Sequence, residues 1–259
     1  MFSFDFTLIK FEFFLLILTR ISMFVVVAPF FNTPNTPVRA KIGFAALVSL
    51  LLYFVLPVQV PEYSTVVGYA FLVVKEAITG VLIGFSTYIC NFIIGFAGQI
   101  IDLNIGLSMA QEYDPTTRST VAITGNLYNY FILLLLIVSD MHRFILKSLC
   151  DAYEVIPVGG TVFHWDSLLT SLLKYMSELF IIGFRIALPV FAVIMILDCV
   201  LGIMVKVAPQ IHMFSVGVQM KVIIGFFVLF VTVFLLPSIA EFIFNEMRTM
   251  MVSFIEGMY

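Results

Sequence analysis

The stretch GQIIDLNIGLSMAQEYDPTTRST, residues 98–120, places a polar segment between two long apolar runs of the chain. Its polar members are Gln99, Asp102, Asn104, Ser108, Gln111, Glu112, Asp114 and Arg118. Groups of this polarity are not stable against lipid, where no water satisfies their hydrogen bonds. They must lie in water, inside protein or along a water-filled path, and the glycines favour a loop that bends. The segment therefore indicates a pathway through a membrane in preference to a simple anchor.

The composition places the rest of the chain in a membrane. Of its 259 residues, 62% are hydrophobic and only 11% are charged, whereas a soluble domain carries about 25% charged residues. The apolar runs are continuous, while the strands of a membrane barrel alternate over roughly 10 residues. The sequence therefore predicts an all-α membrane protein. The formal charge of −3 gives no indication of nucleic-acid binding.

Six long apolar blocks follow one another, and we expect each of them to be helical. They are residues 6–31, 40–56, 66–101, 119–150, 167–206 and 213–244. A membrane-spanning helix needs about 20 apolar residues, so the third, fourth and fifth blocks are long enough to be kinked, tilted or broken into hairpins. Pro209 separates the last two blocks, and Pro237 is expected to break the chain near its end. Gly80 and Gly84 form a small-xxx-small pattern, which permits close helix contact.

Charged residues inside these blocks are costly and are usually paired or functional. They include Lys75, Glu76, Glu178, Arg185, Asp198 and Lys221. We expect ion pairs between helices or between subunits, with a proton or ion relay as the alternative. The charges predicted to lie at such interfaces are Glu76, Arg185, Asp198 and Lys221.

Signatures of catalysis are missing from the sequence. It contains no nucleotide-binding loop, zinc-protease motif, nucleophile elbow or dinucleotide-binding pattern. The three cysteines and three histidines are scattered and form no metal-ligand spacing. The sequence therefore predicts no cofactor, no metal site and no enzymatic activity.

Two segments resemble one known family. The first is GFAGQIIDLNIGLSMAQEYDP (95–115), followed by Ser-Asp-Met-His (139–142) and Ile-Pro-Val-Gly (156–159). The second is FRIALPVFAVIMILDCVLGIMVKVAPQIHMFSVGVQMKVIIG (184–225). In this order they resemble the FliR family, the flagellar member of the type III secretion export gate, whose injectisome counterparts are called SctT. The chain departs mildly from the family pattern at 139–142 and at His212-Met213.

The resemblance implies a pore-forming subunit of the flagellar type III secretion export gate, in the inner (cell) membrane at the bacterial flagellar basal body. It implies passage of unfolded flagellar proteins, FliP-like helical hairpins in residues 1–165, and a FliQ-like hairpin region in 166–259. The implied partners are FliP-like, FliQ-like and FlhB-like subunits, unfolded export substrates and membrane lipid, but no nucleic acid. The positions that match the family motif are Gln99, Asp102, Pro189, Gly202, Pro209, Gln210, Phe214 and Gly217.

The family resemblance also implies a plug loop that closes the empty pore, matched here by residues 106–117. Glycine supplies backbone freedom there, and Leu107 and Met109 suit an irregular constriction. The predicted plug residues are Gly106, Leu107, Ser108, Met109, Ala110, Gln111, Glu112, Tyr113, Asp114 and Pro115. An ordinary cytoplasmic loop is the plainer interpretation of the same residues.

Two other functions compete with the gate. A secondary transporter for a small solute would need related repeats whose broken helices meet at the membrane midplane, and the two halves of the sequence show no convincing repeat. An intramembrane enzyme would need a nucleophile with its base, or a metal constellation, which the motifs do not supply.

Overall fold

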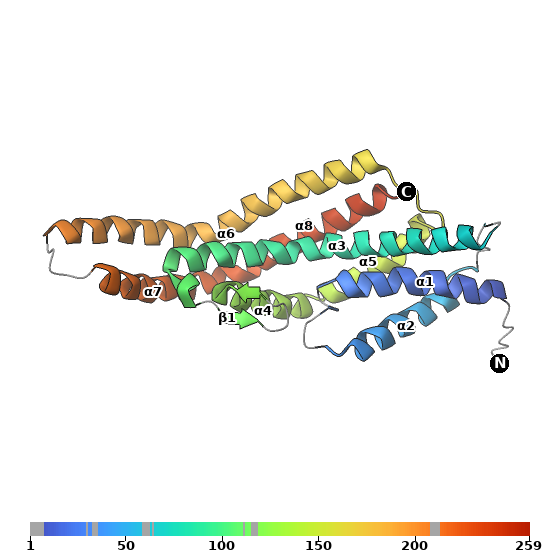
Figure 1. Ribbon diagram of the computed structural model, residues 1–259, viewed down its shortest axis with the longest axis horizontal. Coiled ribbons are helices and arrows are strands. Elements are labelled where there is room, and N and C mark those ends of the chain that lie inside the picture. Colours follow the sequence, from blue (N-terminus) through green and yellow to red (C-terminus); the bar gives the residue numbers. More distant parts are fainter. Residues whose placement is uncertain are drawn as a thin grey trace. The chain divides into compact units, whose positions relative to one another are not determined.

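The computed structural model describes residues 8–29, 31–32, 36–58, 63, 65–110, 112–114, 119–207 and 213–259. Within these ranges the chain forms eight α-helices (Figure 1): α1 (Leu8–Val27), α2 (Val38–Val55), α3 (Val66–Ile105), α4 (Ile123–Val138), α5 (Met141–Val155), α6 (Trp165–Val207), α7 (Met213–Thr232) and α8 (Leu236–Glu256). Two 3₁₀ turns, η1 (Leu107–Ala110) and η2 (Val233–Leu235), and two short strands, β1 (Glu112–Asp114) and β2 (Ser119–Val121), complete it. The predicted all-α class is confirmed.

Two of the six predicted blocks each form two helices. The fourth block divides at Asp140, whose φ of 55° lies in the left-handed region that ends a right-handed helix. The sixth divides at η2, and Pro237 is the second residue of α8, in the first helical turn, where a missing N–H breaks no helical bond. The third block, in contrast, is one continuous helix of 40 residues.

The chain folds into two compact units. The first comprises Met1–Ile89, Asp140–Tyr175 and Glu246–Tyr259, and the second comprises Cys90–Ser139 and Met176–Asn245. These two units are defined by their packing and are not continuous in sequence. The family resemblance instead implies a FliP-like part, residues 1–165, and a FliQ-like part, residues 166–259, and that division stays a prediction.

In the first unit, α1 is the central helix. Its buried residues recur every three or four positions, which is the period of a helix with one face in a core; they are Phe13, Leu16, Ile17, Arg20, Ile21, Phe24 and Val25. Helix α2 lies beside α1 (Figure 1). Helix α3 approaches α1 so closely that a Cβ on Gly80 would lie 2.2 Å from the carbonyl oxygen of Arg20. Glycine at this position therefore sets the distance between the two helices.

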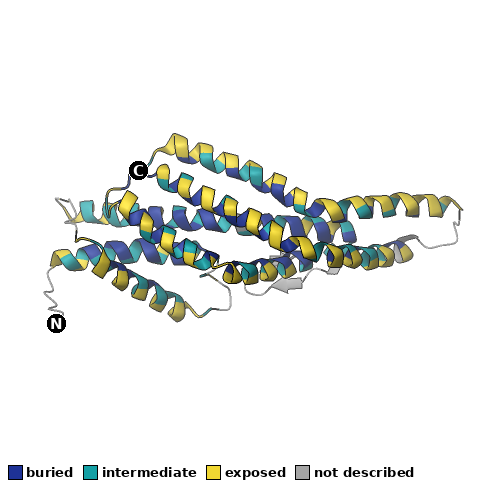
Figure 2. Ribbon diagram, turned by 180° about the vertical axis from the view of Figure 1, so that it is seen from behind, coloured by how far each residue is buried: buried dark blue, intermediate teal, exposed yellow. Residues whose placement is uncertain are grey.

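The second unit is packed around the last four turns of α3. A Cβ on Gly98 would lie 2.1 Å from the Cα of Gly125, so α3 and α4 are in backbone contact. The ring of Phe96 meets α6 at Gly183, where an added Cβ would lie 2.6 Å from the ring. Helix α3 thus contacts α4 through its backbone and α6 through the ring of Phe96. Figure 2 shows buried residues along one side of the helices and exposed residues along the other.

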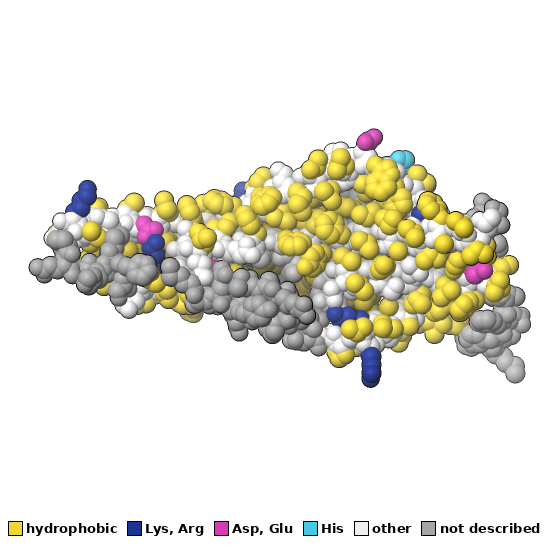
Figure 3. All heavy atoms as spheres, in the orientation of Figure 1, with side chains coloured by type: hydrophobic (Ala, Val, Ile, Leu, Met, Phe, Trp, Pro, Cys, Tyr) yellow, Lys and Arg dark blue, Asp and Glu magenta, His cyan; other side chains and the backbone are white. Residues whose placement is uncertain are grey.

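Large apolar side chains cover much of the described surface (Figure 3). In the second unit the exposed phenylalanines on α7 and η2 include Phe226, Phe227, Phe230 and Phe234. Within the described ranges, four helical stretches are long and apolar enough to cross a membrane: Val38–Val55, Val66–Ile105, Trp165–Val207 and Val216–Glu256. The exposed apolar surface is thus carried by helices that suit a bilayer or apolar partners.

Candidate functional site

The polar segment quoted above forms the end of α3 and the loop between α3 and α4. Helix α3 ends at Ile105, and Gly106 follows with a φ of +92°, donating its N–H to the carbonyl of Asp102 at 3.0 Å. A residue without a Cβ adopts this left-handed conformation at little cost, which makes glycine the common helix terminator. The 3₁₀ turn η1 comes next, and Leu107 in it is buried.

A short antiparallel hairpin occupies the outer part of this loop. Strand β1 pairs with β2 in the register Glu112 with Val121, Tyr113 with Thr120 and Asp114 with Ser119. Of the predicted plug residues, Gln111 and Pro115 lie outside the described residues. The structure describes the backbone alone for Met109, Ala110, Glu112, Tyr113 and Asp114. The sequence did not predict the strand pairing, because three-residue strands leave almost no alternation to recognise.

Both ends of the loop are fixed by buried contacts. The side chain of Asp102 is 1% exposed, and both of its carboxylate oxygens accept the backbone N–H of Thr124 at 3.2 Å. Thr124 is the second residue of α4, so the carboxylate satisfies a free donor and complements the positive end of the helix dipole. Together with the backbone contact of Gly98 and Gly125, this bond holds the start of α4 against α3. Gln99, in the preceding turn, is exposed.

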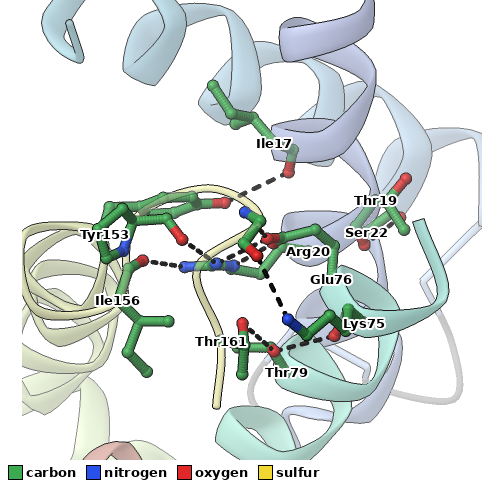
Figure 4. Close-up of polar contacts among 12 residues, drawn as sticks. Ile17, Thr19, Arg20, Ser22, Lys75, Glu76, Thr79, Tyr153, Ile156 and Thr161 are labelled. Carbon is green, nitrogen blue, oxygen red and sulfur yellow. Dashed lines mark hydrogen bonds and ion pairs between the residues drawn. The ribbon is translucent and has the colours of Figure 1, made fainter. Parts of the chain in front are cut away.

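A second polar cluster lies in the core of the first unit, around Arg20 of α1 and Glu76 of α3 (Figure 4). Both side chains are 0% exposed. Arg20 Nε donates to Glu76 Oε2 at 2.5 Å, and Nη2 donates to Oε1 at 2.9 Å. This is the two-bond geometry that a planar guanidinium makes with a carboxylate. The ring of Tyr153 lies 4.3 Å from the guanidinium carbon, which adds a cation–π contact.

The same pair binds the segment that follows α5. Arg20 Nη1 donates to the carbonyl of Ile156 at 3.0 Å, and the N–H of Gly159 donates to Glu76 Oε1 at 2.7 Å. Gly159 has a φ of +79°, a conformation that favours glycine. The hydroxyls of Thr79 and Thr161 are 3.0 Å apart in the same region. The cluster thus joins α1, α3 and residues 156–161 inside a buried core.

Glu76 was predicted from the sequence as an interface charge, but Arg20 was not. The signal was available, because Arg20 is a charge inside the first apolar block and meets the criterion that selected the other residues. The structure places Glu76 in an ion pair within this chain. Its pairing with Arg20 joins residues 56 positions apart.

Two more of the predicted interface charges, Asp198 of α6 and Lys221 of α7, form an ion pair with each other. Lys221 Nζ lies 2.6 Å from Asp198 Oδ1, and the two side chains are 26% and 41% exposed respectively. Arg185 of α6 is exposed and has no acidic partner among the residues that the structure describes. It lines a cavity together with Pro189, which lies inside α6.

The remaining motif residues are spread over α6 and α7. A Cβ added to Gly202 would lie in open space, and a Cβ added to Gly217 would lie 3.7 Å from a methyl carbon of Leu201. Phe214 belongs to α7 and is described by its backbone alone, while Pro209 and Gln210 lie outside the described residues. The described part of the chain brings no three His, Cys, Asp or Glu side chains together in a way that could hold a metal ion.

Comparison with known proteins connects this architecture to one family. The family model described as bacterial export proteins, family 1, matches residues 11–247. The flagellar biosynthetic protein FliR of Pectobacterium carotovorum subsp. carotovorum is 29% identical over 88% of this chain and 86% of its own length. FliR of Bacillus subtilis (strain 168) is 28% identical over 90% of each chain.

The similarity extends to a protein with a different name. The surface presentation of antigens protein SpaR of Shigella flexneri is 28% identical over 62% of this chain and 62% of its own length. The family match spans the described helices from α1 to α8 and includes both the 106–121 loop and the Arg20–Glu76 cluster. The chain therefore belongs to the bacterial export proteins of family 1, the FliR family.

Proposed function

We propose that this protein is a pore-forming subunit of the flagellar type III secretion export gate, which passes unfolded flagellar proteins across the bacterial inner membrane. The observation that carries this proposal is the family match over residues 11–247, which contains the polar segment that an ordinary membrane anchor does not need. Four apolar helical stretches of spanning length support a place in the membrane.

The proposed partners are FliP-like, FliQ-like and FlhB-like subunits in the flagellar basal body. Their support is the family membership together with the exposed apolar side chains of α6 and α7, which need lipid or protein against them. The protein performs no catalysis in this proposal. Energy for export comes from its partners or from the proton-motive force.

Residues 106–117, in the loop between α3 and α4, are the proposed plug. A gate for unfolded chains must seal the membrane when it is empty and yield to segments of any sequence. The structure of the loop suits both demands. Its ends are fixed by the contacts Asp102–Thr124 and Gly98–Gly125, and its outer part is held by the three residue pairs of the β1–β2 hairpin. The fixed ends keep the loop at one place, while a two-stranded hairpin alone is only marginally stable and opens at low cost.

Shortening this loop tests the plug. Residues 112–121 are replaced by a short Gly-Ser linker, and the flux of small ions is measured across membranes that contain the assembled complex. We expect a leak, because the fixed ends remain but the closing segment is gone. The matched control shortens the connection 57–64 between α2 and α3 and should leave the membrane tight. Normal assembly without a leak would contradict the plug, and loss of solute uptake without a leak would favour a transporter.

Co-purification tests the assembly separately. The tagged chain is isolated from its native membrane in mild detergent, and the retained proteins are identified. Several small polytopic proteins in a fixed ratio are expected of a gate subunit. A stable chain that comes out alone, or only with copies of itself, would overturn the assembly proposal.

A further inference from the structure

In the second unit, residues of α4, α6, η2 and α8 line a cavity of about 280 Å³. Ile182, Ile186 and Phe242 contribute apolar walls. The lining residues with polar side chains are Arg185, Tyr128, Thr232 and Ser238. One full positive charge therefore lies beside an apolar space.

No acidic side chain within the described ranges neutralises Arg185. The described ion pairs join Arg20 with Glu76, Arg143 with Asp140 and Lys221 with Asp198. The acidic residues before and after Arg185 on its own helix are Glu178 and Asp198. At 1.5 Å per residue they lie about 10 Å and about 20 Å away along the axis, and neither forms an ion pair with Arg185. Arg185 is exposed and has no acidic partner among the described residues, so its guanidinium is available to an anion from outside this part of the chain.

The position of Arg185 along α6 indicates where that anion lies. The segment 179–197 contains no other charged residue, and its length of about 28 Å matches a hydrocarbon layer of about 30 Å. Side chains of a helix slant toward its N-terminus. The guanidinium therefore extends toward the Glu178 end of the segment, and a long cationic side chain near such an end reaches the headgroup level.

Two further polar groups near Arg185 are available to a ligand. Pro189 lacks the N–H that would bond the carbonyl of Arg185 four residues before it. The exposed hydroxyl of Ser238 makes no hydrogen bond to the residues that the structure describes. A headgroup with a phosphate and hydroxyls satisfies this combination of cation, carbonyl and hydroxyl, whereas a purely apolar chain does not.

We propose that the cavity binds an anionic phospholipid. Arg185 pairs with the phosphate through its planar fork of donors, and the first part of an acyl chain lies against Ile182, Ile186 and Phe242. Basic pockets between membrane helices are known to select anionic headgroups. A bilayer supplies phosphate at the depth that Arg185 reaches, while a partner's carboxylate would have to be desolvated to reach it. This site is separate from the plug and does not depend on it.

The test is native mass spectrometry of the full chain, purified with whatever subunits it retains and titrated with phosphatidylglycerol or phosphatidylcholine. The variant Arg185→Gln removes the charge inside the cavity, and Lys206→Gln removes one exposed charge from the last turn of the same helix. We expect wild type and K206Q to retain one more phosphatidylglycerol than R185Q, whose affinity for that lipid falls at least tenfold. Phosphatidylcholine binds more weakly than phosphatidylglycerol to wild type and K206Q, and millimolar inorganic phosphate does not displace the lipid.

A second variant keeps the test decisive if R185Q folds poorly. Ser238→Phe leaves Arg185 intact but fills the cavity from an exposed position, and it should also lose the extra lipid. Equal phosphatidylglycerol binding by wild type and both cavity variants would overturn the proposal. Loss of partner subunits from R185Q with an unchanged lipid count would overturn it too, because Arg185 would then pair with a protein carboxylate. Displacement by inorganic phosphate would reduce the site to a free-anion site.

Discussion

Removing one member of the buried Arg20–Glu76 pair should destabilise the first unit severely. In Glu76→Met the carboxylate disappears, and with it the acceptor of two Arg20 bonds and of the Gly159 N–H. The guanidinium then stays in a core where both side chains are 0% exposed. Breaking a buried ion pair from one side costs about 3–5 kcal/mol, because the remaining charge is uncompensated.

The double variant Arg20→Met with Glu76→Met should be less damaging than either single variant. Two apolar side chains of similar volume often replace a buried ion pair at little cost. Here the Gly159 amide and the Ile156 carbonyl still lose their partners, which leaves a loss of about 1–3 kcal/mol. The double-mutant cycle should therefore reveal a coupling free energy of several kcal/mol between positions 20 and 76.

The assay is unfolding of the full-length protein in detergent micelles, followed by the fluorescence of its single tryptophan. Trp165 lies at the start of α6 in the first unit and stacks on Phe163 with ring centroids 5.3 Å apart. The control is Arg143→Met, which removes an ion pair whose side chains are 76% and 62% exposed and should cost under about 1 kcal/mol. The proposed importance of the buried pair would be refuted if Arg20→Met and Glu76→Met destabilised the protein no more than Arg143→Met does, or if the coupling free energy between positions 20 and 76 were near zero.

The remaining predictions concern close packing and the ends of the loop. Gly80→Ala should lower the free energy of unfolding by about 1–3 kcal/mol, because its Cβ would meet the Arg20 carbonyl at 2.2 Å. Gly95→Ala in the same helix has open space and should be neutral or stabilising by up to about 1 kcal/mol; equal thermal shifts in the two variants would show that α1 and α3 are not in backbone contact. Asp102→Ala should cost about 1–3 kcal/mol by leaving the Thr124 N–H without its buried acceptor, and hydrogen exchange at the start of α4 should accelerate more than in Asp102→Asn. Unchanged exchange in both variants would argue against the fixed end of the loop.

Several features of the fold were predictable because they depend on local sequence. The fold class and the approximate helix positions follow from continuous apolar runs, and the helix ends follow from glycine and proline. The part of the polar segment after Ile105 was recognisable as a loop, and Gly106 does end α3, whereas residues 98–105 are helical. A break in the fourth block was among the expectations, but its position at Asp140 was not predicted, because the left-handed conformation of that residue cannot be read from its type.

The candidate site was less predictable than the helices. Asp102 was predictable from the sequence, but its partner, the Thr124 amide, was not, because that contact depends on how closely Gly98 and Gly125 bring α3 and α4 together. Glu76 was predicted without Arg20, and the sequence does not show that Asp198 pairs with Lys221 while Arg185 lines a cavity. A charge in an apolar block signals a partner, but the partner's identity is a property of packing.

The sequence by itself determined that this protein is a helical membrane protein of the export family, since hydropathy and the family motifs are read along the chain. The tertiary structure decided which buried charges neutralise one another and where the loop after α3 is held. Arg20 and Glu76 are 56 positions apart, and only the close approach of α1 and α3 at Gly80 allows them to meet. Solvation free energy depends on residue type and so can be read from sequence, whereas electrostatic pairing depends on distances that exist only after the helices have packed.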